Sequence, residues 1–65
     1  MPKERVEEIK TAIVKSDILS EDEKSQSMKH IEEWIVEDKA FGLMYDELLE
    51  VNEIFKEIFK ELGFA

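Results

Sequence analysis

Apolar residues recur along the chain at intervals of three and four positions, which is the spacing of one face of an α-helix. This pattern predicts three helices, at about residues 2–16, 21–38 and 43–62. No segment alternates apolar and polar residues with the period of two that half-buried strands show. We therefore expect an all-α protein, with residues 1–65 forming a single helical domain.

The first two helices carry recognisable start signals. Pro2 suits a first helical turn, because the N–H that proline lacks would have no partner there. Ser20 and Glu23 match the capping box, in which each side chain accepts from the other residue's backbone N–H. The apolar residues of the second helix place an inward-facing stripe at Met28, Ile31 and Ile35, with Trp34 at its edge.

The third helix has the longest apolar pattern. Its spacing of 4-3-4-3-4 is heptad-like and continues over nearly three heptads, at Met44, Leu48, Val51, Phe55, Ile58 and Leu62. Gly42 is the expected turn residue before this helix, and Gly63 is the expected left-handed residue after it. Because the connections are short, successive helices should be antiparallel neighbours in a three-helix bundle with a long C-terminal helix.

Further apolar residues widen the apolar arc of this third helix beyond its seam. With Tyr45, Leu49, Ile54 and Phe59 included, the arc covers more than half of the helix circumference. A surface helix needs an apolar arc of only about 100° or somewhat more. One interpretation is a monomeric core that uses every one of these residues. The other, which we favour, is a homodimer that self-associates through Tyr45, Leu48, Leu49, Ile54, Phe55 and Phe59.

The charge balance limits the possible partners. The chain has 17 acidic and 9 basic residues, for a formal net charge of −8. Such a protein repels nucleic-acid phosphates and attracts basic surfaces. A helix-turn-helix reader is excluded on the same ground, since both candidate recognition helices are acidic. We expect no nucleic acid as a partner.

The acidic charge supports an alternative function, that of an inhibitor, antitoxin-like or immunity-like protein that binds a basic protein partner. In this hypothesis Trp34 is an aromatic anchor, and Glu33 and Glu37 belong to its acidic rim. A simpler interpretation is a solvated helix face whose tryptophan fills the edge of the core.

The residues that carry catalytic or metal chemistry are scarce. The chain has no cysteine and a single histidine, His30. Glu33 follows His30 by one helical turn, but no third ligand has suitable spacing in the sequence. There is no glycine-rich phosphate loop and no plausible Ser-His-Asp arrangement. We therefore expect no enzyme activity, no cofactor and no metal.

Neither a signal peptide nor a membrane span is expected. No apolar run approaches the roughly 20 residues that cross a bilayer, and the first residues lead directly into an amphipathic pattern. These observations predict a cytoplasmic protein. No motif selects a known family, and the pattern as a whole predicts a non-enzymatic protein–protein interaction module.

Overall fold

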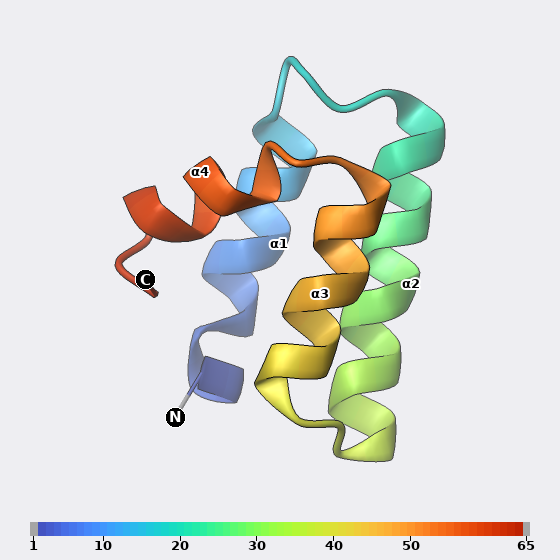
Figure 1. The fold of residues 1–65 in the computed structure, drawn as a ribbon, viewed down its shortest axis with the longest axis vertical. Coiled ribbons are helices and arrows are strands. Elements are labelled where there is room, and N and C mark those ends of the chain that lie inside the picture. Colours follow the sequence, from blue (N-terminus) through green and yellow to red (C-terminus); the bar gives the residue numbers. More distant parts are fainter. Residues whose placement is uncertain (1, 65) are drawn as a thin grey trace.

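The structure, a computed structural model, describes residues 2–64 (Figure 1). This part of the chain contains helices and no strand, so the all-α prediction is confirmed. After a 3₁₀ turn at Pro2–Arg5 come α1 (Val6–Lys15), α2 (Glu21–Glu37), α3 (Phe41–Val51) and α4 (Phe55–Glu61).

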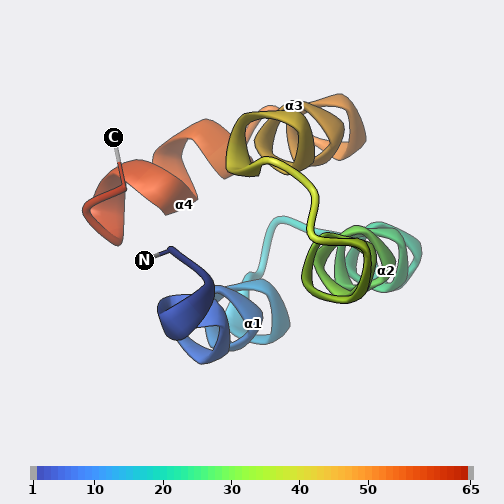
Figure 2. The ribbon, with the colours of Figure 1, turned by 90° about the horizontal axis from the view of Figure 1, so that it is seen from below.

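The helices form two layers around one core. Helices α1, α2 and α3 run alternately up and down, as antiparallel neighbours, whereas α4 turns aside and lies over α1 (Figure 1). Seen from below, α1 and α2 make one layer, and α3 and α4 make the other (Figure 2). The core between them consists of Ile9, Ile13, Leu19, Ile31, Trp34, Met44, Leu48, Phe55 and Phe59.

The predicted third helix over residues 43–62 is wrong, because the structure divides it into α3 and α4. The chain leaves helical geometry at Asn52, where φ is −164° and ψ is 132°. The Oδ1 atom of Asn52 accepts the N–H of Ile54 at 2.9 Å. A local bond of this kind from side chain to backbone stabilises the turn before α4 and competes with continuation of α3. The described chain therefore has four helices, and α2, with 17 residues, is the longest.

The turn before α3 also differs from the prediction. Gly42 lies inside α3, which begins at Phe41. The left-handed residue is instead Asp38, with φ 54° and ψ 43°. Aspartate adopts this conformation more readily than most residues, because its short polar side chain can bond locally.

Two other local signals are confirmed. The Ser20 hydroxyl accepts from the Glu23 N–H at 3.1 Å, and the Glu23 carboxylate accepts from the Ser20 N–H at 2.9 Å. Gly63, which follows the C-cap residue Leu62 of α4, has a φ of 85°. The N–H of Phe64 then bonds the carbonyl of Phe59 at 2.9 Å, which closes the end of that helix.

The inward stripe of α2 is rotated from its predicted position. Ile31 is buried as expected, but Ile35 is 40% exposed. Ser27 and Trp34 are buried in its place, at 0% and 1% exposure. The Ser27 hydroxyl is satisfied inside the core because it donates to the Glu23 carbonyl at 2.7 Å.

An aromatic cluster joins α2, α3 and the C-terminal end. The ring of Phe41 packs edge-on against Trp34 and Phe59, both at 5.7 Å, and stacks with Phe64 at 5.6 Å. The Arg5 guanidinium lies 4.4 Å from the centre of the Phe64 ring and donates to the Leu62 carbonyl at 2.6 Å. These contacts hold the two ends of the described chain side by side (Figure 2).

Replacement of the cap residue Ser20 tests the start of α2. Ser20→Ala removes the side-chain acceptor and should lower the free energy of unfolding by about 1 kcal/mol. Ser25→Ala makes the same chemical change at an exposed position inside α2. It should be neutral or slightly stabilising, because alanine is the better helix former. Urea unfolding measures both; equal losses would contradict the capping role.

Candidate functional site

The residues predicted to form a dimer contact fall into two groups. Leu48, Phe55 and Phe59 lie inside the core of one chain, with exposures of 0%, 0% and 1%. Tyr45, Leu49 and Ile54 are half-buried and pack against the outside of that core. The turn at Asn52 brings Phe55 and Phe59 into the core, because it directs α4 back over the molecule, whereas Leu48 and Leu49 differ in the face of α3 that they occupy. Only the second group remains accessible to a partner.

The Trp34-centred surface is also rearranged. Trp34 lies inside the core rather than on the surface, as the simpler interpretation of its position held. Glu37 is exposed, and Glu33 is half-buried. An acidic surface on α2 therefore exists without an exposed aromatic side chain at its centre.

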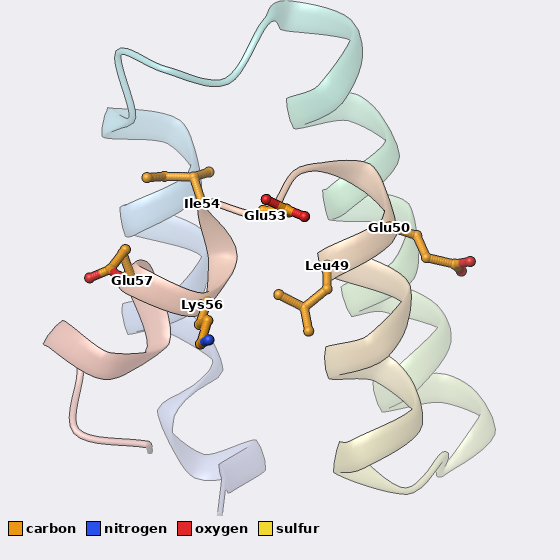
Figure 3. Close-up of a pocket in the computed structure, with 6 residues that line it drawn as sticks. All are labelled: Leu49, Glu50, Glu53, Ile54, Lys56 and Glu57. Atoms are coloured by element: carbon orange, nitrogen blue, oxygen red, sulfur yellow. The ribbon is translucent and has the colours of Figure 1, made fainter.

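Leu49 and Ile54 instead border an open hollow of about 590 Å³ between α3 and α4 (Figure 3). Leu49 points into the space between the two helices, whereas Glu50 and Glu57 point away on either side. Glu53 lies at the turn that joins the helices. The hollow thus has an apolar side chain at its base and carboxylates at its margins.

A second hollow, of about 390 Å³, continues from the first on the other side of Ile54 and Glu57. It lies between α4 and the C-terminal end of α1. Its apolar lining comes from Ile54, Ile58, Leu62, Ala12 and Ile18. We call the two hollows together the acid-rimmed groove.

The groove has more negative than positive charge at its margins. Lys15 and Lys56 are its two basic residues. Within residues 2–64, no ion pair involves the groove carboxylates, which therefore leave their negative charge uncompensated. These five acidic residues are Asp17, Glu50, Glu53, Glu57 and Glu61.

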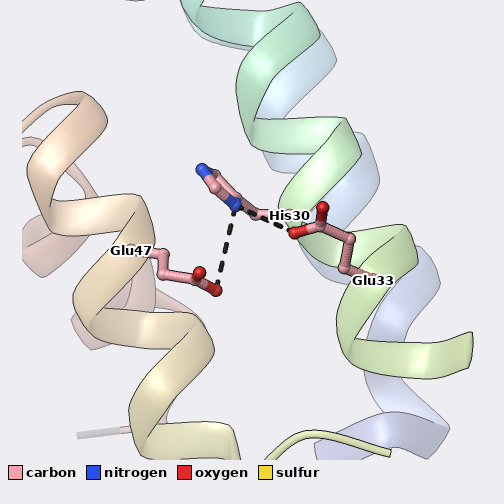
Figure 4. Close-up of side chains that lie close together, drawn as sticks. All are labelled: His30, Glu33 and Glu47. Atoms are coloured by element: carbon pink, nitrogen blue, oxygen red, sulfur yellow. Dashed lines mark hydrogen bonds and ion pairs between the residues drawn. The ribbon is translucent and has the colours of Figure 1, made fainter. Parts of the chain in front are cut away.

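A separate polar cluster lies between α2 and α3 (Figure 4). The Nδ1 atom of His30 is 3.4 Å from Glu33 Oε1 and 3.8 Å from Glu47 Oε1. The ammonium group of Lys39 is 3.2 Å from Glu47 Oε2 and 3.7 Å from Glu33 Oε1. The hydrogen bond to Glu47 raises the pKa of Lys39, and the nearby charges of Glu47, Glu33 and Glu37 act in the same direction. We call His30, Glu33 and Glu47 the histidine–glutamate cluster.

Sequence reasoning found two members of this cluster and missed the third. His30 and Glu33 are one turn apart on one helix, so their proximity follows from helical geometry. Glu47 is on the neighbouring helix, and its position depends on the register between α2 and α3. The only signal in the sequence was the short connection that makes these helices antiparallel neighbours.

A pair of adjacent leucines tests the division between core and groove. Leu48→Ala should lower the free energy of unfolding by about 2–5 kcal/mol, because it leaves a cavity in the core. Leu49→Ala should lower the free energy of unfolding by about 1 kcal/mol or less, since the Leu49 side chain is half-buried and water can fill its place. Urea unfolding followed by Trp34 fluorescence measures both variants. Equal losses would contradict the assignment of Leu49 to the groove.

No helix in the described part of the chain combines the length and apolar character needed to cross a membrane. Comparisons of this chain with family models, with curated proteins and with solved structures gave no match.

Proposed function

We propose that this protein is a non-enzymatic interaction module that binds a basic, amphipathic helical segment of another protein along the acid-rimmed groove. The observation that carries this proposal is the combination of an apolar lining with uncompensated carboxylates at the margins. Leu49 and Ile54, which the sequence pattern predicts as contact residues, both lie in this groove.

The chemistry of the groove favours a partner with one apolar face and basic flanks. An amphipathic helix binds a groove by placing apolar side chains at helical spacing along its floor. Lysine or arginine residues beside that face would meet Glu50, Glu53, Glu57 and Glu61. Charge complementarity of this kind accelerates association and selects among partners.

A second copy of the chain fits the same groove less well. A symmetric dimer would bring the same surface patch of both copies together, and with it the same acidic margins. Leu48, Phe55 and Phe59 would contribute nothing to such a contact, because each is already buried in its own chain. Self-association is therefore the second candidate, with Tyr45, Leu49 and Ile54 as its contact residues.

The exposure of the carboxylates supports binding rather than catalysis. All five acidic residues of the groove are exposed. Catalytic acids and bases need burial or close charged neighbours to adjust their pKa to the reaction. Charges exposed to water are better suited to attract and orient a partner.

A synthetic helical peptide of leucine and lysine, with its leucines on one face, provides a probe for the groove. Glu53→Lys with Glu57→Lys should weaken peptide binding by at least about 10-fold, because it removes the attraction at the groove. Glu32→Lys with Glu37→Lys makes the same change in net charge on α2, near the alternative Trp34 surface. It should weaken binding by less than about 3-fold, since only the long-range field changes. Isothermal titration at low and high salt measures both.

Two results of this titration would contradict the groove. Equal weakening by both double variants would indicate that only net charge matters. Greater weakening of peptide binding by the α2 double variant would indicate that the peptide binds the surface around Glu37. A leucine–glutamate peptide of the same length is the matched probe, and it should not bind.

Sedimentation equilibrium at micromolar concentration tests the second candidate. The wild-type protein should be a monomer at low salt, because the acidic margins repel each other. A dimer that strengthens with salt and dissociates in Leu49→Asp would instead show that a second copy occupies the groove.

A further inference from the structure

We propose that the histidine–glutamate cluster is a binding site for a divalent transition-metal ion of the Zn²⁺ class, and that the ion fastens α2 to α3. The ligands would be the Nδ1 atom of His30 and one carboxylate oxygen each of Glu33 and Glu47 (Figure 4). This site is independent of the acid-rimmed groove.

The positions of the three donor atoms suit a small ion. Zinc binds nitrogen and oxygen at about 2.0–2.2 Å, which places the ligand atoms of a tetrahedral site about 3.4 Å apart. Here Nδ1 of His30 is 3.4 Å from Glu33 Oε1 and 3.8 Å from Glu47 Oε1. All three donor atoms lie within 4.8 Å of one another. Small rotations of the side chains would complete the geometry, with water as the fourth ligand.

The donor set favours a transition metal over magnesium or calcium. Imidazole nitrogen suits zinc, copper and nickel, whereas Mg²⁺ and Ca²⁺ prefer sites made entirely of oxygen. The two carboxylates balance the charge of a divalent ion. One imidazole and two carboxylates therefore supply three protein ligands of the types that zinc binds.

The backbone beneath the cluster is held by the core. His30 and Glu33 belong to α2, where Ile31 and Trp34 are buried at 0% and 1% exposure. Glu47 belongs to α3, next to the fully buried Leu48. Because both helices are fixed by packing, the three ligands are presented together without a large cost in ordering the chain.

Lys39 is the cation that already lies against this position. Its ammonium group lies against Glu33 and Glu47, the same two carboxylates that would bind the ion. A metal ion at the cluster must displace this group, which the flexible lysine stem allows. Lys39 is therefore a competitor for the site, and its removal should strengthen metal binding.

Zinc titration of the metal-free protein tests the site, with binding measured by competition against a chromophoric chelator. We expect one equivalent of Zn²⁺ to bind at micromolar concentration. Saturating zinc should raise the melting temperature by at least about 5 °C, because the ion binds only the folded chain. Magnesium at the same concentration should give no comparable shift.

Single substitutions assign the ligands. His30→Gln and Glu47→Gln should each weaken zinc binding by at least about 10-fold, because each removes one donor atom. Lys39→Gln should strengthen binding, since it removes the competing cation. Glu32→Gln is the matched control, because it removes an exposed carboxylate from the same helix, and it should bind like the wild type. Circular dichroism without metal verifies that each variant is folded.

Three results would overturn the proposal. The first is the absence of a saturable equivalent of zinc. The second is unchanged affinity in folded His30→Gln or Glu47→Gln, which would place any bound ion elsewhere. The third is an equal thermal shift with magnesium, which would indicate unselective binding to surface carboxylates.

Discussion

The extended backbone at Asn52, where the Ile54 N–H donates to the Asn52 side chain, directs α4 back over the molecule, and the composition of the core depends on that direction. A single hydrogen bond of this kind contributes about 1 kcal/mol. Burial of a phenylalanine contributes roughly 1.5–3 kcal/mol, and the turn places both Phe55 and Phe59 inside. Burial of the two aromatic side chains therefore supplies more stabilisation than the hydrogen bond at the turn. A continuous helix would gain a few backbone hydrogen bonds but could not bury its whole apolar circumference.

Signals confined to a few residues were predictable from the sequence. The capping box at Ser20 and Glu23 and the left-handed Gly63 both depend on contacts within one helical turn. The interruption at Asn52 was not predicted, because the apolar spacing continues unbroken across it and asparagine is only a weak breaker of helices. The prediction of which α2 residues face the core was wrong for a different reason. Whether Ser27 or Ile35 faces inward depends on where α1 and α3 lie, which no local pattern encodes.

The same distinction applies to the candidate sites. Leu49 and Ile54 were expected at a contact surface because they widen the apolar arc of the predicted helix beyond its seam. Both residues border the groove. Ile58 and Leu62 belonged to the predicted core, yet the altered path of α4 leaves them half-buried beside α1. Glu47 could not be paired with His30, since that contact requires the relative register of two helices. Helix α3 therefore connects the two sites, with Glu47 on its α2 side and Leu49 on its α4 side.

The contacts of Arg5 with the Leu62 carbonyl and the Phe64 ring have a consequence for local opening. Loss of the final turn would remove these two contacts of Arg5, leaving its ion pair with Glu8, and would also remove the stacking of Phe64 on Phe41. Fraying at one terminus therefore weakens the packing of the other. The first and last turns thus belong to one cooperative unit, although they lie at opposite ends of the sequence. Because the first and last turns open together, their backbone amide hydrogens should exchange with solvent at similar rates.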